Sequence, residues 1–204
     1  MMKLNIQKVL LAVKPYRGVL YFVFLLFLFH FSWKIAISGD RDSEYVYLFG
    51  KDVTPDWVNM VCRWLTSSTS WFVHLFPGTD SLVTGAQYLY FPYGNINITI
   101  LWGCTGIKQL FIFAGIMAFY FGEWKKKCWY IPVGCLILTV YNIMRIGFIV
   151  LLTNGHPERF TFLHDGVFRY IYYTIIFLLW LYWEERMIKK HQKYDSQRKN
   201  TASS

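Results

Sequence analysis

Three residues with the chemistry of acyl transfer lie on three different apolar segments of the chain: Cys104, Arg145 and His164. A cysteine thiolate attacks a carbonyl carbon, and an arginine guanidinium can hold the oxyanion that develops there. A histidine can protonate the leaving amine and later activate an acceptor. Lys108 follows Cys104 by about one helical turn, and a neighbouring cation favours the thiolate. These side chains form a complete set for acyl transfer if the fold brings them together.

Their spacing predicts that they meet near one face of a membrane. Cys104 lies six residues into an apolar stretch at 98–121, about 9 Å from its start at ~1.5 Å per helical residue. Arg145 lies eight residues before the end of a stretch at 128–153, roughly 12 Å from that end. His164 falls in an expected short loop just before a stretch at 166–183.

Four further polar residues are predicted to bind substrate. Thr105 follows Cys104 directly, and Lys108 is expected on the same helix face as Cys104. Asn142 is expected on the face of Arg145, and Arg169 lies three residues into the last stretch. Polar side chains inside membrane spans usually face a partner or a cavity, so these positions are candidates for contacts with substrate.

The composition places the chain in a membrane. Of 204 residues, 55% are hydrophobic, 21% are aromatic and only 16% are charged. A soluble domain is about 25% charged, so this chain is short of the charge needed for a water-facing surface. A bilayer core of roughly 30 Å needs about 20 apolar residues in a helix, and several stretches have that length. These figures argue against a soluble enzyme, a disordered adaptor and a disulfide scaffold.

The predicted fold class is an all-α, multi-pass transmembrane bundle of about four spans. The spans are expected at 16–37, 98–121, 128–153 and 166–183. A fifth stretch, at 56–76, carries Arg63, His74 and a run of Thr and Ser, and is predicted to be an outer interfacial or re-entrant amphipathic helix. The predicted layout is an N-terminus at 1–15, a first transmembrane helix at 16–37, an outer segment at 38–97, a transmembrane core at 98–183 and a tail at 184–204.

The net charge of +9 indicates orientation rather than nucleic-acid binding. Thirteen of the 21 basic residues fall before or at the very start of the first span, in the gap at 122–127 or after the last span. The positive-inside rule therefore predicts that both termini are cytoplasmic and that the site faces outward. No nucleic-acid partner is expected.

Three short motifs around the candidate residues resemble those of a known family. They are Cys104-Thr105-Gly106-Ile107, Asn142-Ile143-Met144-Arg145-Ile146 and Leu163-His164-Asp165-Gly166. In this order, on successive apolar segments, they resemble the signatures of the exosortases and archaeosortases, and the resemblance covers about residues 98–183. It implies that Cys104, Arg145 and His164 are catalytic and that the chain is a minimal bacterial-type member. Trp102 and Thr105 stand where many bacterial members carry an acidic residue and a serine, which leaves the subfamily open.

The resemblance also implies substrates and a location. It implies a membrane-embedded cysteine protease-transpeptidase that cleaves the C-terminal sorting tails of client proteins through a thioester. Such a tail comprises a short motif, a transmembrane helix and a basic cluster. Membrane lipid and a glycan or lipid-linked acceptor are the other expected partners. The expected location is the bacterial cell inner membrane, with the site facing the periplasm or exterior.

One alternative function stays open. Cys104 could be a packing residue and Arg145 a structural one, in a non-enzymatic membrane protein that binds or transports an anionic lipid-linked substrate. No cofactor is expected, and no Cys-x-x-Cys, His-rich tract or His-x-x-x-His spacing predicts a metal site.

Overall fold

The computed structural model describes residues 16–38, 46–52, 56–76, 82–84, 87–91, 96–153 and 156–189. The α-helices are α2 (Arg17–Ala36), α3 (Asp56–Val73), α4 (Ile107–Phe119), α5 (Trp124–Thr153) and α6 (Phe168–Trp183). The 3₁₀ turns are η2 (Trp102–Cys104) and η3 (Pro157–Arg159), and the π-helical turns η4 (Phe162–Val167) and η5 (Glu184–Lys189) flank α6. The expected N-terminus at 1–15 and most of the expected tail lie outside the described residues.

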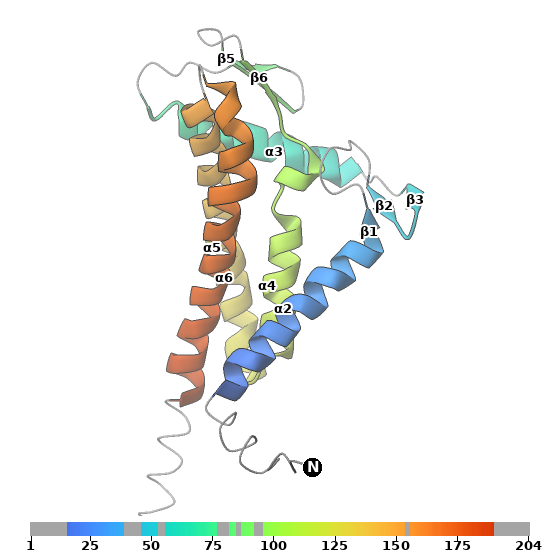
Figure 1. Ribbon diagram of the computed structural model, residues 1–204, viewed down its shortest axis with the longest axis vertical. Helices are drawn as coiled ribbons and strands as arrows, with labels where there is room; N and C mark the ends of the chain where they lie inside the picture. Colours follow the sequence, from blue (N-terminus) through green and yellow to red (C-terminus); the bar gives the residue numbers. More distant parts are fainter. Residues whose placement is uncertain are drawn as a thin grey trace, which may run out of the picture.

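Two small antiparallel sheets accompany the helices. One has the order β1 (Ile37–Ser38), β2 (Tyr47–Leu48), β3 (Lys51–Asp52), and the other has the order β4 (Leu82–Thr84), β5 (Tyr88–Phe91), β6 (Ile96–Thr99). Figure 1 shows α2, α4, α5 and α6 along the length of the molecule, with α3 lying across one end beside both sheets. We call this the α3 end. The opposite end, where α2 begins and α6 ends, is the terminal end.

The prediction of an all-α transmembrane bundle is confirmed. Within the described residues, three helical segments are long and apolar enough to cross a membrane: Arg17–Ala36, Trp124–Thr153 and Phe162–Arg186. The 13-residue α4 measures about 20 Å at ~1.5 Å per residue, which is less than a bilayer core. It therefore needs the non-helical segment before it to complete a crossing.

The expected helix at 98–121 is wrong over its first nine residues. Residues 98 and 99 belong to β6, residues 102–104 form η2, and α4 begins only at Ile107. Gly106, immediately before α4, has a φ of 75°, in the left-handed region that glycine adopts without steric cost. A continuous right-handed helix therefore stops at this residue.

The expected span at 128–153 begins earlier, at Trp124, so the lysine cluster lies in the first turn of α5. Lys127 is only 3% exposed, and its ammonium donates to the backbone oxygens of Ala118, at 3.0 Å, and Tyr120. Carbonyls at the end of a helix have no intrahelical partner. Lys127, one of the basic residues from which the sequence analysis predicts the orientation, is thus buried and caps the C-terminal end of α4.

Helix α3 is amphipathic, as expected for a helix at an interface. On its buried face, Leu65 and Val73 pack in a cluster with residues of α5, whereas Val58 and Cys62 pack in a cluster with Trp33 and Trp102. Trp57, Trp64 and Trp71, spaced seven residues apart, are all exposed. Tryptophan is enriched at membrane–water interfaces, which fits the position of α3 across the end of the bundle (Figure 1).

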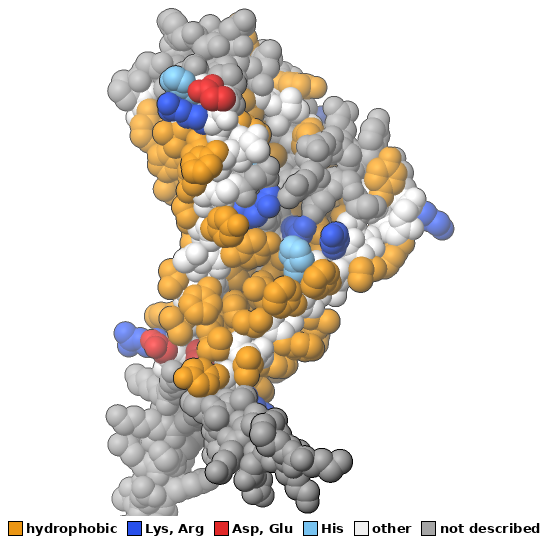
Figure 2. All heavy atoms as spheres, in the orientation of Figure 1, with side chains coloured by type: hydrophobic (Ala, Val, Ile, Leu, Met, Phe, Trp, Pro, Cys, Tyr) orange, Lys and Arg blue, Asp and Glu red, His pale blue; other side chains and the backbone are white. Residues whose placement is uncertain are grey.

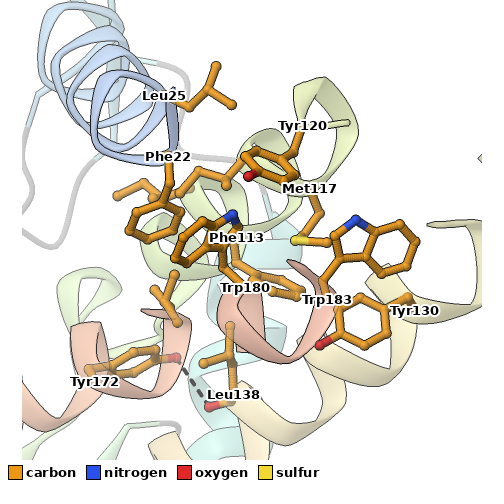
Figure 3. Packing of buried hydrophobic residues seen from close by; sticks show 13 residues of the cluster. Phe22, Leu25, Phe113, Met117, Tyr120, Tyr130, Leu138, Tyr172, Trp180 and Trp183 are labelled. Atoms are coloured by element: carbon orange, nitrogen blue, oxygen red, sulfur yellow. Dashed lines mark hydrogen bonds between the residues drawn. The ribbon is translucent and has the colours of Figure 1, made fainter. Parts of the chain in front are cut away.

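The largest buried cluster fills the half of the bundle toward the terminal end. Figure 3 shows aromatic and aliphatic side chains from α2, α4, α5 and α6 packed together. Within it, the Tyr172 hydroxyl donates to the Leu138 carbonyl at 3.1 Å, and the Tyr120 hydroxyl donates to the Glu184 carboxylate at 2.7 Å. The fully buried members include Phe113, Ile116, Met117, Leu138, Tyr172, Ile176, Trp180 and Trp183.

We predict that Gly134→Ala destabilises the bundle by roughly 1–3 kcal/mol, because the close approach of α4 to α5 leaves no room for a methyl group. A Cβ at Gly134 would lie 2.3 Å from the Phe113 ring. The measurement is thermal unfolding of the purified protein in detergent. Val133→Ala is the matched control, since Val133 is exposed on the same helix. Equal unfolding temperatures for the two variants would contradict the prediction.

Candidate active site

Cys104 is the last residue of η2, in the turn between β6 and α4. The hydroxyl of Thr105 donates to the Trp102 carbonyl at 2.7 Å, which closes this turn. The backbone N–H of Ile107 donates to the same hydroxyl at 3.4 Å. The expectation that Cys104 and Lys108 lie one turn apart on a single helix is therefore wrong: Lys108 is the second residue of α4, after the break at Gly106.

Asn142 of α5 holds the Cys104 turn in place. Its side-chain amide donates to the Cys104 carbonyl at 2.8 Å. The Asn142 side-chain oxygen accepts a hydrogen bond from Nη1 of Arg145 at 3.3 Å. Both side chains are buried, with 1% of Asn142 and 7% of Arg145 exposed. A chain of side-chain hydrogen bonds thus runs from Arg145 through Asn142 to the backbone of Cys104.

Arg145 is the central charge of this region. Its guanidinium lies within electrostatic range of Cys104, of Tyr141 and Tyr172, and of the cation Arg169. Its Nε is buried and has no hydrogen-bond partner among the described residues. A buried donor of this kind is costly unless it has a partner, so the geometry leaves one N–H of Arg145 for an acceptor that enters the site.

Tyr172, which the sequence analysis missed, packs against the turn. A Cβ at Gly106 would lie 3.0 Å from the Tyr172 hydroxyl and 3.1 Å from Cγ of Asn142. Only a residue without a side chain fits comfortably there. The sequence could have indicated a role for Tyr172, because it follows Arg169 by three residues and so lies on the same face of the helix.

His164 lies in η4, which runs directly into α6. The expectation of a loop at this position is therefore wrong, because the backbone from Phe162 onward is already helical. The imidazole stacks on Phe160, with ring centroids 5.2 Å apart and planes 9° apart. This stacking sets the orientation of the His164 ring, while its contact with Cys104 stays a prediction.

The other predicted substrate-binding residues take different positions. Lys108 and Arg169 are half-buried, on the first turns of α4 and α6. The Thr105 hydroxyl is occupied in the turn, so its described role is to shape the backbone around Cys104. The described residues hold no group of three or more His, Cys, Asp or Glu side chains placed to bind a metal.

Cys62 of α3 is a second thiol near the site. It is 1% exposed, and burial, with a smaller contribution from Cys104, raises its pKa to about 11. Because the thiolate is the nucleophile, a cysteine with this pKa is unreactive near neutral pH. No disulfide joins the four cysteines of the chain.

A comparison with protein families identifies the class of protein. The family model described as transmembrane exosortase matches residues 46–182. The chain belongs to the transmembrane exosortase family. Searches of curated proteins and of solved structures return no match. Exosortase membership indicates a membrane protein with a sorting role of the transpeptidase type. The matched region contains Cys104, Arg145 and His164 and most of the described bundle.

We predict that Asn142→Leu destabilises this exosortase by roughly 1–3 kcal/mol, because the Cys104 carbonyl and Arg145 Nη1 lose a buried partner. The measurement is thermal unfolding in detergent. Thr139→Val, one turn earlier on α5, is the control because it removes only a bond from the Thr139 hydroxyl to the Cys135 carbonyl within the helix. If both variants unfold at the same temperature, the bond to Cys104 does not hold the turn.

We also predict that Cys62 of the folded exosortase resists alkylation at pH 8. With a pKa of about 11, roughly one Cys62 in 10³ is a thiolate at that pH. The rate should rise about tenfold per pH unit toward pH 11, since the deprotonated fraction rises by that factor. Peptide mapping after N-ethylmaleimide treatment measures this, with denatured protein as the control. Equal labelling of folded and denatured protein at pH 8 would contradict it.

Proposed function

We propose that the chain is a membrane-embedded cysteine protease-transpeptidase that cleaves the C-terminal sorting tail of a client protein. Cys104 is the nucleophile, Arg145 binds the oxyanion, and His164 is the acid–base group. The observation that carries the proposal is the placement of Cys104 in a 3₁₀ turn outside the α-helices, within electrostatic range of the buried Arg145.

The turn around Cys104 suits a nucleophile better than a helix would. In a continuous helix, the backbone would be enclosed in its own hydrogen bonds and side chains, and a substrate chain could not approach closely. Here the helix is interrupted at Gly106, and the Cys104 side chain is only partly buried. A cation nearby favours the thiolate, so Arg145 supports the reactive form of Cys104.

Arg145 also has a donor for the transition state. When the thiolate attacks the scissile carbonyl, the oxygen becomes an oxyanion, and donors already in position stabilise it. Nη1 of Arg145 is engaged by Asn142, which fixes the plane of the guanidinium, whereas Nε has no partner among the described residues. An oxyanion beside Arg145 would satisfy this buried donor.

His164 completes the proposed cycle. The Cys104 sulfur forms a bond to the carbonyl carbon, the carbon–nitrogen bond breaks, and protonated His164 gives its proton to the leaving amine. The product is a thioester of the client on Cys104. Neutral His164 then takes a proton from the acceptor, or from water, as it attacks the thioester and releases the thiolate.

The proposed clients end in a short motif, a transmembrane helix and a basic cluster, and the acceptor is a glycan or a lipid-linked group. The proposed location is the bacterial inner membrane, with both termini in the cytoplasm. The cations Lys3, Lys8 and Lys14 before α2 and those after α6 support this orientation. The α3 end, with its exposed tryptophans and the Cys104 turn, would then face the periplasm.

We predict that Cys104→Ala abolishes client processing while the protein still accumulates in the membrane, because no other group supplies the thioester. Cys128→Ala is the matched control, since Cys128 is exposed on α5 away from the site, and it should process clients normally. Each variant is expressed with a tail-bearing client, and the client mass is measured. Normal client processing by the Cys104→Ala variant would contradict the proposal. It would favour a non-enzymatic protein that binds an anionic lipid-linked substrate.

A further inference from the structure

Helices α2 and α6 pack on each other near the terminal end and then separate. There the Phe22 ring of α2 lies 4.5 Å from Trp180 and 5.7 Å from Phe177 of α6. Nearer the α3 end, Trp33 of α2 packs instead on Phe111 of α4, at 5.3 Å, and on Trp102, at 6.3 Å. Figure 1 shows α2 diverging from α6 toward the α3 end, with α4 between them. We call the face that α2, α4 and α6 form together the wedge.

The flanks of α2 and α6 that lead into the wedge change from apolar to basic toward the α3 end. On α2, Leu26 and His30 follow Phe22 at four-residue spacing, and each step turns about 40° around the helix. Lys34, one step farther, is exposed. On α6, the corresponding residues before Phe177 are Tyr173 and Arg169. Both series are thus apolar or aromatic near the terminal end and carry a basic side chain farther along.

The first turn of α4 adds a third basic group. Lys108 lies one turn before Phe111, which contacts Phe29 and Trp33 of α2, so Lys108 lies on the side of α4 toward the wedge. Figure 2 shows Lys, Arg and His side chains gathered in the middle of this otherwise apolar face. The basic groups of the wedge thus come from three different helices.

The basic groups of the wedge are partly removed from water. His30, Lys108 and Arg169 are half-buried, and Arg145 lies within electrostatic range of Arg169. At low effective dielectric, like charges repel strongly, so a cluster of cations favours an anion between them.

We propose that the wedge binds an anionic phospholipid of the surrounding membrane, with its phosphate on Lys108 and Arg169. The distance along α6 from Arg169 to Phe177 is about 12 Å at ~1.5 Å per residue, so one acyl chain can lie along the apolar part of the wedge. A free phosphate ion would make no use of these apolar walls. The wedge has basic groups toward the α3 end and apolar side chains toward the terminal end. A phospholipid with its headgroup toward the α3 end has the matching distribution of charge and apolar surface.

The proposed lipid site shares Lys108 and Arg169 with the predicted substrate contacts, but it does not include Cys104. The phosphate contacts come from α4 and α6, and the acyl chain contacts α2 and α6. Cys104→Ala should therefore bind the lipid as the wild-type chain does. Loss of client processing and loss of lipid binding are separate results, so either proposal can fail without the other.

A cavity at the opposite end of the bundle provides a matched control. It has a volume of about 430 Å³ and is lined by Arg17, Leu20, Tyr21, Phe24 and Phe121. The Arg17 guanidinium lies 5.8 Å from the centre of the Phe121 ring. Arg17 is thus another cation beside apolar walls, but it lies outside the wedge.

The test is native mass spectrometry of the purified full chain with dioleoyl-phosphatidylglycerol or dioleoyl-phosphatidylcholine. The wild-type chain should retain the anionic lipid in preference to the zwitterionic one. The double variant Lys108→Gln, Arg169→Gln should weaken this retention roughly 30-fold, and Arg17→Gln should leave it unchanged. Wild-type retention by the double variant, or loss of retention in Arg17→Gln alone, would overturn the proposal.

A second measurement covers the case in which the double variant does not fold. Benzoylphenylalanine replaces Leu26 in an otherwise wild-type chain, which is irradiated in membranes that contain dioleoyl-phosphatidylglycerol. The expected product is an adduct with the mass of that lipid. An adduct with a polypeptide and none with lipid would show that a protein segment occupies the wedge, and would overturn the proposal.

Discussion

The hydrogen bond from the Asn142 side chain to the Cys104 carbonyl is the interaction on which the rest of the site depends. Away from water, a chain that leaves a helix must find other partners for its backbone polar groups. Asn142 supplies one, and Arg145 is held by the same side chain. Asn142 therefore contributes to three features of the site. These are the interruption before α4, the position of the Cys104 thiol and the orientation of the Arg145 guanidinium.

Helix α5 can carry that residue because it approaches its neighbours closely on both sides. Near one end of α5, Gly134 lies against the Phe113 ring of α4, and near the other end Gly147 lies against the Phe72 ring of α3. Asn142 and Arg145 lie between these two contacts. Helices α4 and α3 thus pack closely onto α5 on either side of Asn142 and Arg145 along the helix, and this packing keeps the two polar side chains buried.

The apolar runs predicted the helices well because hydrophobic length follows directly from the sequence. The break at 98–106 was missed, because the apolar run continues through it, and the neighbours that crowd Gly106, Asn142 and Tyr172, are distant in sequence. The buried role of Lys127 was missed for a related reason: its partners are the last carbonyls of another helix. The proximity of Cys104 to Arg145 was predicted, whereas the part played by Tyr172 needed the three-dimensional arrangement.

The aromatic cluster toward the terminal end has a consequence for the permeability of the membrane. Side chains from α2, α4, α5 and α6 fill that half of the bundle, and no buried member of the cluster carries a charge. A polar path from one end of the bundle to the other would need these apolar side chains to move apart. The cluster therefore acts as an apolar plug at the terminal end.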